Sequence, residues 1–235
     1  PLNQDMKIQN ISLLEEMLKI LNDEDKRAEL IDRMSEISYT PPEGNVWTHI
    51  GAGGENDYEG WMFEDVAKEW GITVQEMMTR MMAETSLACG MRVAPPGNVR
   101  QWRQVEEDVM QLMARPDYMV GSDSIPVGGM PHPRAYGCFV RMLGRLRRRH
   151  NYPVEQVVQR MTQNPAKRFG LADRGVIAKG KFADLVIFDE QNVIDRSSFE
   201  DPKMHPEGVP FVLVNGKFAV ENEAVTGVLA GQAIP

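Results

Sequence analysis

Residues 173–189 read DRGVIAKGKFADLVIFD, and this stretch marks a change in the composition of the chain. Its second half, Ala183 to Phe188, is rich in the branched and aromatic side chains that favour strands. Phe211 to Val214 has the same character, and Asn215-Gly216 separates it from Lys217 to Val220 as a two-residue hairpin turn would. The pattern therefore predicts an all-β tail that begins near residue 173.

Before residue 173, short strand patterns alternate with helical patterns, as is typical of parallel β-α units. Strand composition is found at 46–50, 89–93 and 118–120, which gives about three strand candidates before Asp123. A complete (β/α)8 barrel needs about 250 residues by itself, so the chain cannot hold a complete barrel. Apolar residues recur at helical spacing in the segments between, the clearest being 11–21, 61–70, 74–83, 98–114 and 134–150.

The charge balance argues against a protein that binds nucleic acid. The 235 residues include 26 Lys and Arg against 34 Asp and Glu, a formal net charge of −8, whereas proteins that track phosphates need a basic surplus. No apolar run approaches the roughly 18 to 20 residues of a membrane span, and residues 1–10 lack the pattern of a secretory signal. We therefore expect a soluble, cytoplasmic protein with no nucleic-acid or membrane partner.

The cysteines and a stripe of methionines are predicted to be structural. Cys89 and Cys138 lie far apart without C-x-x-C or C-x-x-H spacing, so we expect neither a disulfide nor a thiolate zinc site. Four methionines between 77 and 82 recur at helical spacing, which is typical of core filling.

Five strings in a fixed order carry a resemblance to a known superfamily. They are GSD at 121–123, PHPRAYGCF at 131–139, MTQNPAKRFGL at 161–171, the opening stretch at 173–189, and FEDPKMHPEG at 199–208. Together they resemble the C-terminal part of the amidohydrolase superfamily, and the second and fifth resemble its N-acyl-D-amino-acid deacylase (D-aminoacylase) branch. The resemblance runs from about residue 60 to the C-terminus and is weaker over the first 55 residues.

The resemblance implies an α/β fold in two parts. Residues 1–172 would be the C-terminal part of a (β/α)8 barrel of the metal-dependent hydrolase type, and residues 173–235 a portion of a small β-sandwich. The implied activity is metal-dependent hydrolysis of non-peptide C–N (amide) bonds in N-acyl-D-amino acids. Two alternatives stay open: a dihydroorotase-like or hydantoinase-like amidohydrolase, and a catalytically inactive half-barrel whose exposed strand edges bind another chain.

The metal ligands of the superfamily are largely missing from this chain. Its His-x-His after the first barrel strand has no counterpart, since no two of the four histidines stand at i, i+2 or i, i+4. A catalytic zinc normally needs three protein ligands. The resemblance therefore implies zinc with ligands mostly outside this chain. It also implies a partner, either the missing N-terminal half of the barrel or a second copy in a homo-oligomer.

Asp123 is the candidate catalytic residue and the candidate metal ligand. In the family the matching carboxylate contacts the metal, takes a proton from the activated water and returns it to the leaving amine, a role that needs a rigid acid within hydrogen-bond reach. Without the neighbouring strings, Asp123 would be interpreted as an ordinary turn aspartate.

Arg134 and His132 are the candidate substrate-binding residues. Arg134 lies near the start of a predicted helix, where the macrodipole disfavours a cation. The resemblance implies that its guanidinium pairs with the α-carboxylate of the substrate, and the alternative is a solvated arginine. His132, held between two prolines, would line the same mouth or be a loop histidine with no chemistry.

Two further motifs are predicted to have no catalytic role. The basic run at 145–150 ends a predicted helix, where cations complement the dipole, so we interpret it as a solvated helix end. The glycines at 51–54 lack the spacing of a phosphate-binding loop and are interpreted as a strand-end loop.

Overall fold

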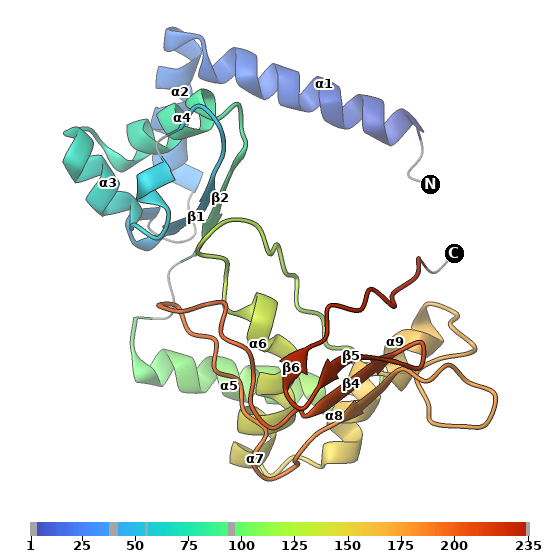
Figure 1. Cartoon of the computed structure of the whole chain (residues 1–235). Helices are drawn as coiled ribbons and strands as arrows, with labels where there is room; N and C mark the ends of the chain where they lie inside the picture. Colours follow the sequence, from blue (N-terminus) through green and yellow to red (C-terminus); the bar gives the residue numbers. More distant parts are fainter. Residues whose placement is uncertain (1–3, 38–41, 55, 94–96, 234–235) are drawn as a thin grey trace. The chain divides into compact units, whose positions relative to one another are not determined.

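The computed structural model describes residues 4–37, 42–54, 56–93 and 97–233 and shows an α/β protein (Figure 1). The chain divides into two compact units, the first made of residues 1–95 and 126–132 and the second of 96–125 and 133–235. Within the described residues the strands form two small antiparallel sheets, and no barrel is closed. The predicted domain boundary at residue 173 stays a prediction.

In its described residues the first unit has four helices, two short 3-10 turns and a two-stranded sheet. In chain order they are α1 (Gln4–Leu21), α2 (Glu24–Ile37), η1 (Pro42–Gly44), β1 (Val46–Ile50), η2 (Asn56–Tyr58), α3 (Phe63–Trp70), α4 (Val74–Glu84) and β2 (Cys89–Arg92).

Local signals in the sequence explain where α3 ends and α4 begins. Gly71 adopts the left-handed conformation, φ 68°, that closes α3. Thr73 caps α4 by accepting a hydrogen bond from the Glu76 N–H, and Glu76 accepts one from the Thr73 N–H in return, which is a capping box.

The core of the first unit confirms the predicted methionine stripe. Met77 and Met81 are fully buried on α4, where they pack with Phe63 of α3 and Trp47 of β1. The predicted strand-end loop is also found, because Gly53 has φ 99° and a Cβ there would lie 2.2 Å from the Glu84 carbonyl oxygen. This loop is therefore shaped by close backbone packing.

The second unit combines short helices with a four-stranded sheet of order β3-β4-β5-β6. Its elements are α5 (Val99–Met113), α6 (Arg134–Arg141), the π-helical turn η3 (Met142–Leu146), α7 (Arg147–Arg149), α8 (Val154–Met161), α9 (Gln163–Arg168), β3 (Leu185–Ile187), β4 (Phe211–Val214), β5 (Lys217–Glu221) and β6 (Ala224–Val225).

The C-terminal hairpin was predictable and is confirmed. Asn215 and Gly216 form the turn between β4 and β5 with positive φ at both positions, 48° and 76°. Arg174 and Asp184, from the stretch at 173–189, fix this turn: Arg174 donates to the Asn215 side chain at 3.0 Å, and Asp184 accepts the Asn215 N–H at 2.7 Å.

Two predictions about strands are wrong. The first two strands do not form parallel units, because β1 and β2 pair antiparallel, with Trp47 opposite Met91. Tyr118 to Val120 is not a strand, because other groups occupy its backbone: the Val120 N–H donates to the Arg160 carbonyl at 3.1 Å.

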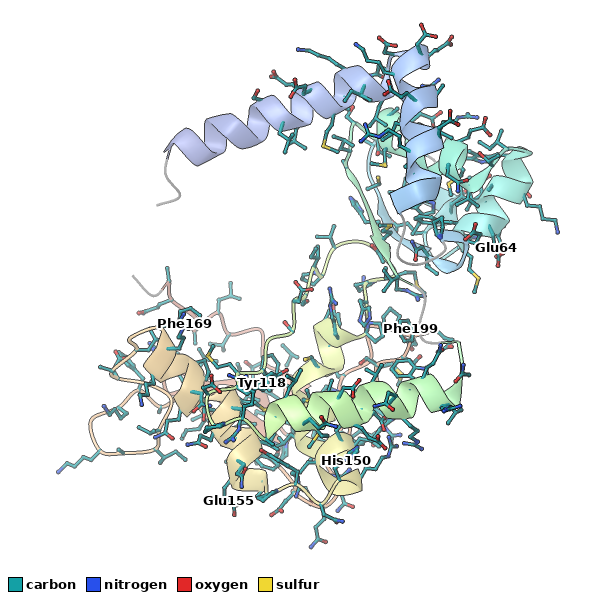
Figure 2. All side chains as sticks on the ribbon, turned by 180° about the vertical axis from the view of Figure 1, so that it is seen from behind. Glu64, Tyr118, His150, Glu155, Phe169 and Phe199 are labelled. Atoms are coloured by element: carbon teal, nitrogen blue, oxygen red, sulfur yellow. The ribbon has the colours of Figure 1, made fainter. Side chains whose placement is uncertain are left out.

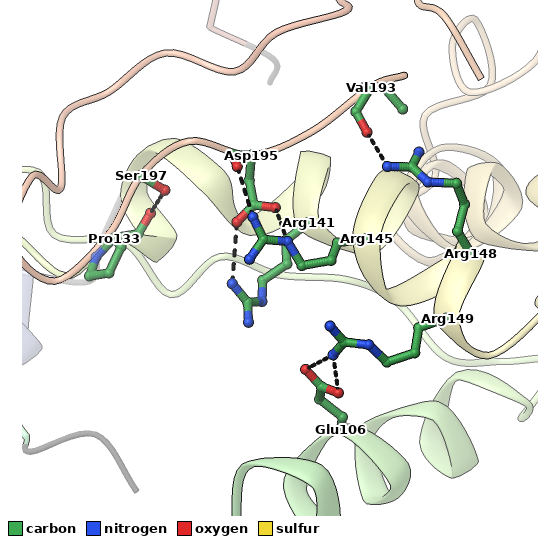
Figure 3. A network of polar contacts seen from close by, with 9 residues as sticks. All are labelled: Glu106, Pro133, Arg141, Arg145, Arg148, Arg149, Val193, Asp195 and Ser197. Atoms are coloured by element: carbon green, nitrogen blue, oxygen red, sulfur yellow. Dashed lines mark hydrogen bonds and ion pairs between the residues drawn. The ribbon is translucent and has the colours of Figure 1, made fainter. Parts of the chain in front are cut away.

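The predicted solvated helix end is also wrong. Arg147 is 9 % exposed and donates to the Glu190 carbonyl oxygen at 2.8 Å, while Arg148 donates to the Val193 carbonyl oxygen at 2.9 Å. Arg149 forms an ion pair with Glu106 of α5 (Figure 3). The basic run therefore attaches neighbouring segments to α7.

Among the described helices, none is long and apolar enough to cross a membrane.

Candidate functional site

Asp123 lies in the irregular segment that connects α5 to α6. Its backbone is in the left-handed region, φ 46°, which aspartate tolerates better than most residues. Its side chain is 86 % exposed. The carboxylate is therefore presented to solvent from a turn, with room for a bound molecule.

Arg134 is the first residue of α6, and the structure brings it to Asp123. Arg134 Nη2 lies 2.9 Å from Asp123 Oδ2, and the arginine side chain is 41 % exposed. The aspartate explains why a cation is tolerated at a helix N-terminus, because its negative charge offsets the unfavourable interaction with the dipole. Exposed ion pairs contribute only about 0–1 kcal/mol, so either group can exchange its partner for a ligand.

His132 is half-buried between the buried prolines Pro131 and Pro133. It ends the segment 126–132, which belongs to the first unit, whereas Asp123 and Arg134 belong to the second. The structure therefore joins two of the three predicted residues, and the role of His132 stays a prediction.

Glu59, which the sequence analysis did not single out, holds the segment 126–132. Its two carboxylate oxygens accept the N–H groups of Ile50 at 2.9 Å and Gly129 at 2.8 Å, and His49 Nδ1 lies 3.5 Å away. Partial burial raises the pKa of Glu59, but these hydrogen bonds and His49 outweigh it, so its pKa is lowered overall. No local motif signals this contact, because Gly129 is 70 residues away.

Asn164 lies in the first turn of α9 and does not cap it, although Asn before Pro is typical of an N-cap. The helix α9 begins one residue earlier, at Gln163. The Asn164 side-chain amide instead donates to the carbonyl oxygens of Pro116 and Tyr118, at 2.8 Å each (Tyr118 is labelled in Figure 2). Asn164 thus contacts the segment that leads to Asp123.

The residues of this chain do not make a complete metal site. In the described ranges no group of three or more His, Cys, Asp or Glu side chains could hold a metal ion. Both cysteines are free, as predicted, and burial raises the pKa of each thiol, which disfavours the thiolate form. One carboxylate, Asp123, falls short of the three protein ligands that a catalytic zinc requires.

Comparison with known proteins identifies the family. The amidohydrolase family model matches residues 67–220. A D-aminoacylase of Alcaligenes xylosoxydans xylosoxydans is 42 % identical over 130 residues, covering 55 % of this chain and 27 % of that protein. An N-acyl-D-glutamate deacylase of the same organism is 36 % identical over 161 residues, covering 65 % and 33 %.

A solved structure agrees with these relatives. An N-acyl-D-glutamate deacylase from Bordetella bronchiseptica, complexed with zinc and a phosphonate inhibitor, matches with a TM-score of 0.62 and 33 % identity, covering 75 % of this chain and 34 % of that one. The chain spans about a quarter to a third of the length of these relatives. Because the family model matches well over half of the chain, the protein belongs to the amidohydrolase family.

Proposed function

We propose that this chain carries part of the active site of a metal-dependent amidohydrolase that cleaves N-acyl-D-amino acids to a carboxylic acid and a D-amino acid. The observation that carries the proposal is the 2.9 Å contact between Asp123 and Arg134. In an N-acyl-amino acid, the scissile nitrogen and the carboxylate are attached to the same carbon. The two groups of the substrate therefore lie close together, as do the proton-transfer group and the carboxylate-binding group proposed here.

Asp123 is assigned the proton transfer. Amide hydrolysis requires the attacking water to lose a proton and the leaving amine to gain one, and a positioned carboxylate can do both in turn. Arg134 is assigned the substrate carboxylate, because a guanidinium offers two parallel donors that match its two oxygens. A substrate carboxylate that binds Arg134 takes the place of Asp123 there and leaves the aspartate free for the water.

The same geometry favours a deacylase over the other amidohydrolase activities. A hydantoin has no free carboxylate for Arg134 to bind. In dihydroorotate, the nitrogen that is cleaved is not attached to the carbon that bears the carboxylate. The match to two deacylases over 130 and 161 residues supports the same choice.

The proposed cofactor is zinc, with Asp123 as a ligand from this chain and the other ligands outside it. Zinc is present in the Bordetella deacylase complex. The described residues do not complete a metal site, and the roles proposed for Asp123 and Arg134 rest on their mutual contact. His132 is proposed to line the opening of the same active site.

The rest of the enzyme is proposed to cover an apolar cleft in the second unit. The cleft has a volume of about 1060 Å3 and lies between helices α6, α8 and α9 and the strands β3 to β5. Val186 on the edge strand β3 remains 54 % exposed beside it. In this proposal residues 1–172 are the C-terminal part of the barrel and residues 173–235 a portion of the sandwich, which the missing half completes, either in cis or as a second chain.

A substrate panel tests the proposal. The chain is expressed together with the part of the Alcaligenes D-aminoacylase that it does not cover, and the relative's own C-terminal part serves as the control for assembly. We expect hydrolysis of N-acetyl-D-glutamate or of an N-acetyl-D-amino acid with an apolar side chain, weaker hydrolysis of their methyl esters, and none of hydantoin or dihydroorotate. An assembled, zinc-loaded complex that cleaves only the cyclic substrates, or none, would contradict the proposal.

A further inference from the structure

We infer that Asn164 and Arg160 are positioning residues that hold Asp123 in place, an inference that rests on the catalytic role proposed for Asp123. Both residues contact the segment that runs from the end of α5 to Val120, three residues before Asp123. The role we infer for both residues acts through this backbone segment and not through the substrate.

The first observation concerns Asn164. Its single side-chain amide nitrogen joins two carbonyl oxygens of this segment, those of Pro116 and Tyr118. Tyr118 to Val120 has no strand partner in the described part of the chain. The Asn164 amide therefore donates a hydrogen bond of the kind that a neighbouring strand would otherwise supply. The contact spans 46 residues of sequence and ties α9 to the approach to Asp123.

The second observation concerns Arg160, which is only 4 % exposed. Its guanidinium donates to the carbonyl oxygens of Met113 at 3.0 Å and Arg115 at 3.1 Å, and its own carbonyl accepts the Val120 N–H at 3.1 Å. A buried cation is costly unless its N–H groups find acceptors. The carbonyl groups at and just after the C-terminus of α5 accept these hydrogen bonds, and the negative end of the helix dipole there also stabilises the positive charge. Arg160 therefore fixes both ends of the stretch that Asn164 holds in the middle.

Two neighbouring contacts continue the same attachment. The Tyr152 hydroxyl donates to the Met113 carbonyl oxygen at 2.7 Å. Beyond Val120, the Cys138 thiol lies 3.8 Å from the Gly121 carbonyl oxygen, which connects the segment to α6, the helix that begins with Arg134. The backbone is thus held from Met113 to Gly121, whereas the carboxylate of Asp123 itself is exposed.

The test uses Asn164→Asp, which keeps the shape of the side chain but replaces the donor with an oxygen that faces two carbonyls. The matched control is Gln163→Glu, the same chemical change at the exposed neighbouring position of α9. Hydrogen exchange of the purified chain, followed by mass spectrometry, should accelerate by about tenfold or more in peptides covering 116–123 and not in α8 or β4. The control should leave all peptides unchanged.

Unchanged exchange at 116–123, or an equal increase throughout the second unit, would overturn the inference. If Asn164→Asp does not fold, Asn164→Ala removes the same two hydrogen bonds without adding a charge and is judged by the same criteria.

Activity of the assembled enzyme separates this inference from the proposed function. Asn164→Asp should lower kcat about 10- to 100-fold, with KM within about twofold because Arg134 on α6 still binds the substrate. If kcat is unchanged while Asp123→Asn abolishes turnover, the positioning role is wrong. If Asp123→Asn also keeps turnover, the proposed catalytic function is wrong, and the exchange experiment alone decides whether Asn164 holds the segment.

Discussion

At the scale of single residues, the protein places an exposed carboxylate and an exposed guanidinium at the two ends of one short connection. Asp123 and Arg134 are eleven positions apart in the sequence, and a turn residue and a helix N-terminus bring them to 2.9 Å. Both side chains remain accessible, so their ion pair stabilises the fold by at most about 1 kcal/mol. This contact is better suited to exchanging ligands than to holding the structure together.

Asp123→Asn should remove most turnover in the assembled enzyme while the fold and substrate binding persist. An amide has nearly the same shape but cannot accept a proton from water and return it to the amine, so we expect kcat to fall about 10²- to 10⁴-fold. Steady-state kinetics on N-acetyl-D-glutamate measure this. A variant with near-normal kcat would show that the aspartate has another role.

Arg134→Lys should weaken capture of the substrate instead. A lysine ammonium keeps the charge but cannot form two parallel hydrogen bonds with a carboxylate, so we expect KM to rise about tenfold and kcat to change little. The methyl ester of the substrate is the control, since it lacks the carboxylate and should be insensitive to the substitution. Unchanged kcat/KM on the free acid would rule out the assigned contact.

Some of these residues could be predicted from the sequence and others could not. Asp123 and Arg134 belong to short strings that are recognisable locally. The contacts of Glu59 with Gly129 and of Asn164 with Pro116 and Tyr118 join residues 46 to 70 positions apart, and the neighbouring residues carry no sign of them. The local pattern at Asn164 points elsewhere, because Asn before Pro is typical of a helix N-cap.

At the scale of elements, the segment 193–197 packs directly on the helical run from α6 to α7. Asp195, 2 % exposed, accepts a hydrogen bond from Arg141 at 3.2 Å and forms an ion pair with Arg145 at 3.4 Å (Figure 3). The Ser197 hydroxyl donates to the Pro133 carbonyl oxygen at 3.0 Å.

Two glycines allow the segment 193–197 to approach these helices closely. A Cβ on Gly137 would lie 2.3 Å from Ser197 Oγ, and one on Gly144 would lie 2.3 Å from the Val193 carbonyl oxygen.

Gly144→Ala should destabilise the protein by about 1–3 kcal/mol, although alanine normally stabilises a helix by about 1 kcal/mol relative to glycine. The reason is that a methyl group at residue 144 would meet the backbone of Val193, whereas one at residue 137 would meet the side chain of Ser197, which can rotate. Gly137→Ala is therefore the matched variant, with a smaller expected loss. Urea unfolding measures both, and a stabilised Gly144→Ala would contradict this packing.

Glu106 should make the stability depend on pH, because it links α5 to α7. Burial raises the pKa of its carboxyl, but hydrogen bonds and charge from Arg149 and Arg103 outweigh that and lower the pKa below its ordinary value of 4.5. A lowered folded-state pKa contributes stability that is present above about pH 4.5 and lost as the pH falls through the folded value.

We therefore expect the free energy of unfolding to fall more steeply between about pH 5 and 3 in the wild type than in Glu106→Gln. Glu107→Gln, at the exposed neighbouring position, should keep the wild-type slope. Equal slopes for all three proteins would show that the ion pairs of Glu106 do not contribute.

The elements themselves were largely predictable, whereas their pairing was not. Caps and turns such as Thr73, Gly71 and Asn215-Gly216 act within a few residues, so the sequence displays them directly. The alternation of strands and helices along the chain does not specify which strands become neighbours in the sheet. It therefore does not predict that β1 and β2 pair with each other and run antiparallel. Tyr118 to Val120 has strand composition, yet the Asn164 side chain of α9 and the Arg160 backbone carbonyl of α8 bind its backbone instead.

At the scale of the whole molecule, the chain is a member of the amidohydrolase family. Its described residues bring together Asp123 and Arg134, for which we propose proton transfer and carboxylate binding, but they form no cluster of metal ligands. The large apolar cleft beside β3 is consistent with a surface that the remainder of the enzyme covers. We therefore propose that the active site is shared between this chain and residues outside it.

The zinc content of the purified chain tests whether the active site is shared in this way. The chain is loaded with excess zinc, dialysed against metal-free buffer and analysed by plasma mass spectrometry, in parallel with the assembled enzyme. We predict well under one tightly held equivalent for the chain alone, because a single carboxylate does not make a three-ligand site, and at least one equivalent for the assembly. A firm one-to-one zinc content in the isolated chain would show that this chain holds a complete metal site and would rule out a shared one.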